Sequence, residues 1–508
     1  MVNIFQMLTT TIRISCLALL ALGIFIGDLS ASGVEHFDKP PSIKDLEQRL
    51  NDIDAELETL ASYSLRGGVG SVGYRSQAHE DYNAKEWIQV DLGLEEVIDE
   101  IVLVPTIWRD TKTGFRADGF PEEFKIIVGS KGDEEGQVIA TYGPQDKLLP
   151  RIAPLVIPCD GVAGSWVRVE ATKLSRRAWD KKYILQLFEI LVFSGEDNVA
   201  LQKPVEVSSP YFDDEGNRDK NHLVDGFGPY LMDASQGEQS PAFFIQLPVE
   251  SKPTFTVDLG VRQTLNRIHI HALDLSDTVP QSFNNGFGMP RRLLVEGSDH
   301  ADFSKCERLV EYQIESVYDD GPILTLGFAP VTCRYVRIAA LEPFQRISRG
   351  RLTTEIGFAE IELFSNGQNV ALEKTFESNF IVDPLQDRRT LRSLTDGRNL
   401  YGEILPTRAW MGELARRHVL EEARPRLVAE LELRYARQTT NLNRLGWLAV
   451  LLGAGIVVTI LVDRLIRMRH VAKVRLRLAA DLHEQLRAKL HTIGLLRDLA
   501  TDTIHDPD

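Results

Sequence analysis

The chain has 508 residues, of which 43% are hydrophobic and 26% are charged, and its formal net charge is −16. This length allows two or three domains. The acidic balance argues against nucleic acid as a partner, because phosphate backbones attract basic surfaces.

The first 33 residues are predicted to be a secretory signal peptide. Arg13 precedes the apolar run ISCLALLALGIFIG at 14–27, and small residues follow at 30–33. A basic start, a short apolar middle and a small-residue exit are typical of such a leader. An uncleaved anchor is the alternative, although the run is short for a full membrane span. Either reading places residues from about 34 to 444 outside the cytoplasm.

The segment 34–62 is predicted to contain an amphipathic helix. Its stretch IKDLEQRLNDIDAELETL at 43–60 has leucine or isoleucine at positions 46, 50, 53, 57 and 60. This spacing puts the apolar side chains on one narrow helix face. We therefore expect the helix to pair with, or pack against, another element.

Short strands with period two follow, and four blocks of them recur in the same order. WIQVDLG at 87–93 matches FTVDLG at 255–260, FKIIVGS at 124–130 matches LLVEGSD at 293–299, WVRVEATKL at 166–174 matches YVRIAALEP at 335–343, and FEILVFSG at 188–195 matches AEIELFSNG at 359–367. The offset of about 170 residues is the size of a domain. The fold class predicted for this exterior part is mainly β, with two antiparallel jelly-roll sandwiches at 63–196 and 197–367.

Motifs in the second copy point to a known family. NVALQKPVEVSS at 198–209, LVDG at 223–226, FTVDLG, YVRI and AEIELF occur in that order. They resemble the discoidin or coagulation-factor C-type domain, a galactose-binding-like jelly roll. The first copy lacks the NVALxKP opening. NVALEKTF at 369–376 and LTDG at 394–397 read as the start of an incomplete third repeat within 368–444.

The resemblance implies binding of sugars, phospholipid head groups or proteins through loops at one end of each sandwich. Aromatic faces and hydrogen-bond donors suit a glycan, so the candidate ligand-binding residues are Trp108, Arg109, Phe115, Arg116, Phe283, Asn284, Asn285 and Phe287. The alternative is that these aromatics pin the loops to the sandwich. The family also implies a structural calcium ion, for which Asp225 and Glu360 occupy the matching motifs of the second copy, with Glu189 alone in the first.

The exterior part shows no catalytic motif such as G-x-S-x-G or HExxH, and no Cys/His cluster with metal-ligand spacing. An exported carbohydrate enzyme is therefore disfavoured. An exported location permits a Cys306–Cys333 bridge, but free, buried cysteines are the preferred reading.

A helical connector at 410–438, with Pro425 inside it, leads to the uncharged stretch LGWLAVLLGAGIVVTILV at 445–462. As a helix this stretch is about 27 Å long, close to the hydrocarbon thickness of a bilayer. Six basic residues follow between 464 and 477, as on the cytoplasmic side of a span. These features predict a single-pass protein of the inner membrane with its large part in the periplasm.

The tail at 463–508 is predicted to be a coiled-coil-like helix, with an apolar stripe at Leu478, Leu482, Leu486, Leu490 and Ile493. RLAADLHEQLRAKL at 477–490 is similar to the phosphoacceptor box of dimerising histidine kinases of the nitrate-sensor type. The resemblance implies His483 as phosphoacceptor and Glu484 as the group that takes or orients its proton. Glu484 stands where that family has Asp, and Arg487 where it has Gly.

The sequence ends at Asp508, so we expect no ATP-binding domain and no autokinase activity, with ATP and magnesium available only through a partner kinase. The preferred hypothesis is a truncated sensor of a two-component phosphorelay. Its expected partners are a second copy or a homologous kinase, a response regulator, the membrane and an exterior glycan. The alternative is a membrane-tethered carbohydrate-binding or adhesion protein that does not signal.

Overall fold

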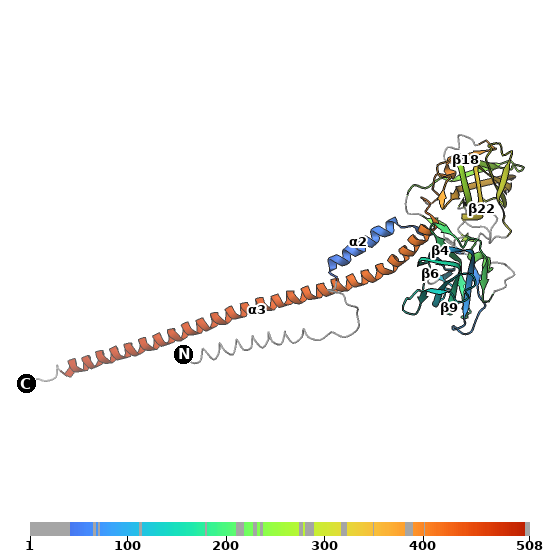
Figure 1. The fold of residues 1–508 in the computed structure, drawn as a ribbon. Coiled ribbons are helices and arrows are strands. Elements are labelled where there is room, and N and C mark those ends of the chain that lie inside the picture. The colour runs from blue at the N-terminus through green and yellow to red at the C-terminus, as the bar shows by residue number, and fades with distance from the viewer. Residues whose placement is uncertain are drawn as a thin grey trace, which may run out of the picture. The chain divides into compact units, whose positions relative to one another are not determined.

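The computed structural model describes residues 41–64, 68–69, 72–110, 114–177, 180–209, 218–226, 231–233, 237–273, 278–279, 289–315, 323–348, 350–381, 390–400 and 402–502. The chain divides into two compact units, one of residues 1–49 with 431–508 and the other of residues 50–430 (Figure 1). The predicted leader at 1–33 lies outside the described residues.

The first β-sandwich is built on an antiparallel sheet in the order β14-β13-β4-β9-β7-β8, with β15 also paired to β4. Its strands are β4 (Glu86–Val104), β7 (Glu123–Gly129), β8 (Gln137–Tyr142), β9 (Leu155–Lys173), β13 (Glu189–Ser194), β14 (Asp197–Asn198) and β15 (Val205–Val207). Alternate residues of β4, such as Ile88, Val90 and Leu92, are fully buried. The period-two pattern of the sequence therefore corresponds to one face of a strand that lines a core.

The second β-sandwich repeats this plan, with the sheet order β17-β24-β18-β22-β20-β21. Its strands are β17 (Phe243–Leu247), β18 (Thr254–Ala272), β20 (Arg292–Ser298), β21 (Cys306–Gln313), β22 (Ile323–Glu342), β23 (Phe344–Ser348), β24 (Arg351–Ser365), β25 (Gln368–Asn369) and β26 (Phe376–Ser378). Phe243, Phe255 and Phe358 meet edge to face in its core. The described part of the chain is thus mainly β, as the sequence predicts.

The repeat extends to single hydrogen bonds. Asp91 Oδ1 accepts from the Gly93 N–H and Asp258 Oδ1 accepts from the Gly260 N–H, each at 2.8 Å. Both glycines have positive φ angles, +82° and +84°, which explains the shared VDLG motif because other residues rarely adopt this conformation.

The two NVAL segments lie in different sandwiches from those that the sequence suggested. β15 pairs with β4, and Ala200, Val205 and Leu223 belong to the first core. In the same way β26 pairs with β18, and Ala371, Phe376 and Leu394 belong to the second core. The described residues of the range 197–226 therefore complete the first sandwich. The described residues of the range 368–397, which we interpreted as an incomplete third repeat, complete the second. The boundaries predicted at 196 and 367 therefore move toward the C-terminus.

Two helices flank the sandwiches. Helix α2 (Ile43–Thr59) agrees with the expected 43–60 to within one residue. It starts at a capping box, in which Ser42 Oγ accepts from the Asp45 N–H and Asp45 accepts from the Ser42 N–H. Helix α3 (Thr407–Asp502) has 96 residues and continues through Pro425. Within the larger unit, ion pairs Glu56–Arg416 and Asp54–Arg424 join the two helices side by side.

The first turns of α3 pack on the first sandwich. Trp410, Met411 and Leu414 are buried in one cluster with side chains of β4 and β13, among them Val102 and Leu191. Arg408 adds an ion pair to Glu100, with N and O 3.7 Å apart. The connector is therefore fixed to the first sandwich before it continues to its apolar part.

The apolar stretch 445–462 lies on α3, and this helix is long and apolar enough to cross a membrane. Large apolar side chains along it are exposed, including Trp447 at 70% and Ile456 at 63%. A buried core helix would not show this exposure. The prediction of a segment that can span a bilayer is thus supported by its length, composition and exposure.

Candidate functional site

The first predicted ligand loop forms a β-hairpin of β5 (Ile107–Asp110) and β6 (Gly114–Ala117). Trp108 stands opposite Arg116 and Arg109 opposite Phe115 in its register. The structure describes the backbone of Trp108 and Arg109 but not their side chains. Phe115 is partly buried against the cluster that contains Trp410. For Phe115 the structure therefore favours the alternative that the aromatic pins the loop.

Arg116 belongs to a group of arginines around the carboxyl group of Asp118. Burial raises the pKa of Asp118, and four nearby guanidinium groups oppose this, those of Arg177, Arg218, Arg116 and Arg75. Arg75, Arg177 and Arg218 are buried, whereas Arg116 is partly exposed. The arginine cluster, as we call these four residues with Asp118, thus extends from the interior to the surface of the first sandwich.

Gln186 lies beside this cluster. It pairs with Arg75 in the two-stranded ladder of β12 (Gln186–Leu187) and β3 (Tyr74–Arg75), and its N–H donates to the Gly119 carbonyl over 2.8 Å. The side chain is 1% exposed, and neither its amide oxygen nor its amide nitrogen has a hydrogen-bond partner. A buried amide without partners costs free energy. No sequence signal marked this residue.

The second predicted ligand loop contains Phe283, Asn284, Asn285 and Phe287, all of which lie outside the described residues.

In each sandwich a buried glutamate lies beside an aspartate at the equivalent place, Asp225 in the first and Asp396 in the second. Glu189 Oε1 accepts from the Gly226 N–H over 3.0 Å, and Glu360 Oε1 accepts from the Gly397 N–H over 2.9 Å. Burial raises the pKa of Glu189, with Asp225 raising it further, and burial raises the pKa of Glu360 to about 9, with Asp396 adding to the effect. The family motifs suggested Asp225 and Glu360 for one calcium ion, and this grouping was wrong, because the two residues belong to different sandwiches.

The donor set of these two places suits a hard cation. In both glutamates Oε2 is buried and has no hydrogen-bond partner. Calcium prefers carboxylate and carbonyl oxygens, and a bound cation would stabilise the ionised form that burial disfavours. Glu189 with Asp225, and Glu360 with Asp396, therefore fit a structural calcium ion.

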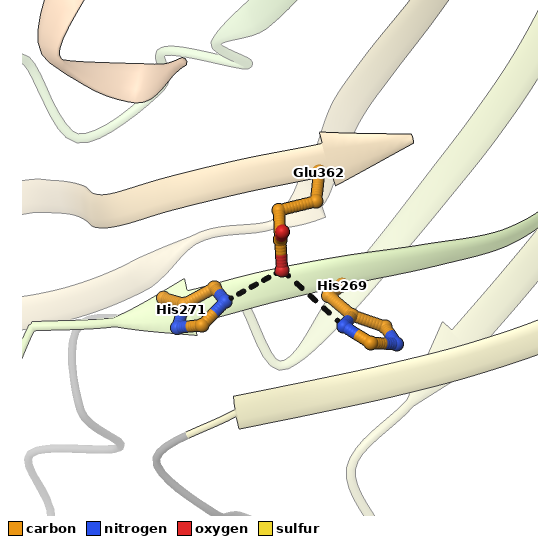
Figure 2. A group of neighbouring side chains, drawn as sticks. All are labelled: His269, His271 and Glu362. Carbon is orange, nitrogen blue, oxygen red and sulfur yellow. Dashed lines mark hydrogen bonds and ion pairs between the residues drawn. The ribbon is translucent and has the colours of Figure 1, made fainter. Parts of the chain in front are cut away.

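A third polar group lies on the second sandwich and was not found from the sequence. His269 and His271 on β18 and Glu362 on β24 are all buried and can place one ligand atom each within 4.8 Å of the others. Figure 2 shows both imidazoles directed at one carboxylate oxygen. His269 Nδ1 is 3.3 Å and His271 Nε2 is 3.0 Å from Glu362 Oε2. The HIH pattern on a strand was the available signal, since residues i and i+2 share a face.

The surroundings of this group favour the neutral form of one side chain and the ionised form of another. Burial lowers the pKa of His269, so its imidazole is neutral at pH 7. Burial opposes ionisation of Glu362, but hydrogen bonds from His269 and His271 outweigh it and lower the pKa of this carboxyl to about 2. A neutral imidazole and an ionised carboxylate result.

His483 and Glu484 lie on the exposed surface of α3. The neighbouring apolar stripe is also exposed, with Leu482 at 54% and Leu490 at 64%. Among the described residues Cys159, Cys306 and Cys333 are free thiols, and Cys306 is exposed. The Cys306–Cys333 bridge that the sequence left open is not formed.

No protein-family model and no curated protein matches this chain. Among solved structures, CpGH89CBM32-5 of Clostridium perfringens in complex with GalNAc-beta-1,3-galactose is 20% identical, with 24% of this chain and 75% of that chain covered and a TM-score of 0.17. The CBM32-1 and CBM32-2 domains of Clostridium perfringens ZmpB are 10% identical, with coverage of 62% and 96% and a TM-score of 0.19. An f-lectin from striped bass (Morone saxatilis) serum is 13% identical, with coverage of 61% and 97% and a TM-score of 0.17. At these scores the likeness decides neither the fold nor the ligand of this chain.

Proposed function

We propose that the protein is a membrane-tethered receptor whose first sandwich binds a glycan at the arginine cluster and Gln186. The observation that supports this most directly is the buried Gln186 amide, which has no partner beside a cluster that reaches the surface at Arg116. Because the side chain is 1% exposed, a ligand bound at Arg116 would supply the missing partners through a single hydroxyl or a water molecule that enters beside Gln186.

The chemistry of the cluster suits such a ligand. The amide of Gln186 offers two donors and an acceptor, and the guanidinium groups around Asp118 give the place a positive charge. Vicinal hydroxyls and sugar carboxylates need this mixture, and an aromatic face, for which Trp108 is the candidate, would cover the sugar ring. The same place would favour an acidic sugar, because guanidinium binds carboxylate in a bidentate way.

The affinity of one such site should be weak, at about micromolar or above, because a single sugar buries little surface. Two chains on one membrane would raise the apparent affinity for a polymer by avidity.

The test is a glycan array followed by titration of the best ligand against the full chain in detergent. Arg116→Ala and Gln186→Leu should each weaken binding at least tenfold. Gln186→Leu should not destabilise the fold, because leucine removes an amide that lacks partners. Arg334→Ala, a change on the second sandwich, is the matched control and should leave binding unchanged. Full binding by both variants would move the site elsewhere.

We also propose that the sandwiches lie in the periplasm and that the tail after residue 462 lies in the cytoplasm. The basic residues between 464 and 477 support this orientation. A structural calcium ion in each sandwich, held by Glu189 with Asp225 and by Glu360 with Asp396, is part of the same proposal.

Signalling through His483 is the second candidate function, and the exposed leucine stripe beside this residue favours it. An uncovered stripe on a helix suits pairing with a second helix, as in a kinase dimerisation hairpin. The alternative is adhesion without signalling.

A phosphotransfer assay separates these two readings. The purified chain is incubated with labelled ATP and a full-length histidine kinase of the nitrate-sensor type. A sensor should be labelled as wild type and as His491→Gln, but not as His483→Gln. Label that persists in His483→Gln would remove this residue from the site, and no label on any form would favour adhesion.

A further inference from the structure

The outer face of the second sandwich differs from that of the first at equivalent positions. In the first sandwich Val102 stands opposite Leu191, and Val104 stands opposite Glu189. In the second, His269 stands opposite Glu362 and His271 opposite Glu360. Since Glu189 and Glu360 are equivalent, the pair His269–Glu362 replaces Val102–Leu191. The repeat itself shows that this fold does not need polar side chains here.

Ionisable side chains in place of apolar ones at a buried position cost folding free energy unless they pair or bind a ligand. His269 is 8% and His271 is 3% exposed, and the side chain of Glu362 is 12% exposed. Burying a carboxylate and two imidazoles costs free energy, which only well-placed partners offset. A function at this place would explain why the second copy has them.

The geometry agrees with ligands around one metal ion. With metal–ligand bonds of about 2.0–2.2 Å, adjacent ligand atoms of a tetrahedral site lie about 3.3–3.5 Å apart. The two N···O distances here, 3.3 Å and 3.0 Å, are near that separation. All three ligand atoms, two from β18 and one from β24, lie within 4.8 Å of one another (Figure 2).

The donor set selects the kind of metal. Two imidazoles and one carboxylate suit zinc and its neighbours in the first transition series, whereas calcium and magnesium prefer oxygen ligands only. Three protein ligands leave the fourth position of a tetrahedral site open. A cavity of about 60 Å³ adjoins the three side chains, which is enough for a water molecule or another small ligand at that position.

The cavity also reaches the start of α3. Its lining includes Phe193 of the first sandwich, Thr325 and Phe364 of the second, and Leu405 and Thr407, where the chain enters the helix. An ion bound here would tighten the place where the second sandwich meets the segment that leads to α3.

We propose that His269, His271 and Glu362 bind a transition-metal ion, with zinc as the best fit, on the face of the second sandwich next to the start of α3. The site shares no residue with the two carboxylate pairs or with the arginine cluster, and Glu360 of one carboxylate pair stands opposite His271. The competing explanation is a metal-free network in which both imidazoles donate to Glu362. Arg267, which pairs with Asp197 over 3.0 Å, adds a positive charge nearby and would weaken an ion without excluding it.

The test is a Co²⁺ titration of the purified full chain in detergent, read by visible absorption, with Zn²⁺ then added as competitor. A tetrahedral Co²⁺ site gives intense d–d bands near 550–650 nm at about one equivalent, and Zn²⁺ abolishes them. His271→Gln and Glu362→Gln should lose these bands or need at least tenfold more Co²⁺. His300→Gln, which changes an exposed histidine of the same sandwich, is the matched control and should keep them.

Circular dichroism shows whether each variant is folded. If His271→Gln fails to fold, Glu362→Gln still tests the proposal, because glutamine keeps the shape and hydrogen-bonding capacity of the side chain. Absence of the bands in the wild type, or equal bands in wild type and a folded Glu362→Gln protein, would overturn the proposal and leave the metal-free network.

Discussion

The two sandwiches have the same internal framework but different outer faces. Asn198 in the first sandwich and Asn369 in the second cap equivalent turns. Asn198 Oδ1 accepts from the Val192 N–H over 3.1 Å, and Asn369 Oδ1 accepts from the Leu363 N–H over 3.2 Å. On the outer face the first copy is apolar and packs against Trp410 of α3, whereas the second has two histidines and a glutamate. The duplication therefore kept the residues that fold the domain, while one face became a docking surface and the other a polar site.

The largest effect should come from removing the contact of α3 with the first copy. Trp410 is 3% exposed, so Trp410→Ala should lower the free energy of unfolding by about 3–5 kcal/mol through the cavity it leaves. Denaturant unfolding of the full chain in detergent measures this. Val419→Ala, on the same helix but 52% exposed, is the control and should change little. A loss below 1 kcal/mol for Trp410→Ala would mean that α3 is not anchored there.

The apolar residues of the first copy can be transferred to the second. In the triple variant His269→Val, His271→Val and Glu362→Leu, the free energy of unfolding in metal-free buffer should be unchanged or higher by about 1–4 kcal/mol, because buried ionic groups rarely exceed apolar packing in stability. The same unfolding measurement checks it. A loss of more than about 2 kcal/mol would show that the polar group stabilises the fold itself.

Calcium should act on both copies alike. At a concentration 100 times its dissociation constant, an ion that binds only the folded state adds about 2.7 kcal/mol. Calcium should slow hydrogen exchange of β13 in the first sandwich and of β24 in the second. Glu189→Gln should abolish this protection in β13, and Glu360→Gln should abolish it in β24. A response of both sandwiches that survives both substitutions would exclude these carboxylates as ligands.

The smallest effect concerns Arg334 and Asp258, an exposed pair joined by two hydrogen bonds of 2.8 Å each. Hydrogen bonding to Arg334 lowers the pKa of Asp258 to about 2, below its usual value, so the contribution to stability is present above about pH 4 and is lost as the pH falls toward 2. Arg334→Ala should shift the thermal midpoint at pH 7 by no more than about 2 °C, and less in high salt. A shift above 5 °C would contradict this view of the pair.

The repeat was predictable because strands that line a core must alternate in hydrophobicity, and because VDLG needs its glycine. The sandwich that each NVAL segment completes was not predictable. A segment between two similar domains can pack on the domain that precedes it or on the domain that follows it, and its motif is the same in both cases. The pairing of β15 with β4 shows that the first NVAL segment packs on the preceding domain. The candidate calcium-binding residues were grouped wrongly for that reason alone, since Glu189 and Asp225 were both recognised.

The residues of the histidine–glutamate group and Gln186 were not predicted from the sequence, for a different reason. His269 and Glu362 are adjacent only because β18 and β24 pair, and a sequence separation of this length gives no spacing signal. Gln186 lacks any motif, and its importance depends on the absence of partners in the folded state.

The proposed receptor requires the sandwiches and the tail to lie on opposite sides of a membrane, and labelling with a membrane-impermeant maleimide tests this directly. Cys306 is exposed on the second sandwich, and Thr492 is exposed on the tail. In intact spheroplasts the wild type should be labelled at Cys306. A Thr492→Cys variant that also has Cys306→Ser should be labelled only after the membrane is permeabilised. Labelling of the tail cysteine in intact spheroplasts, with Cys306 protected, would contradict the proposed receptor.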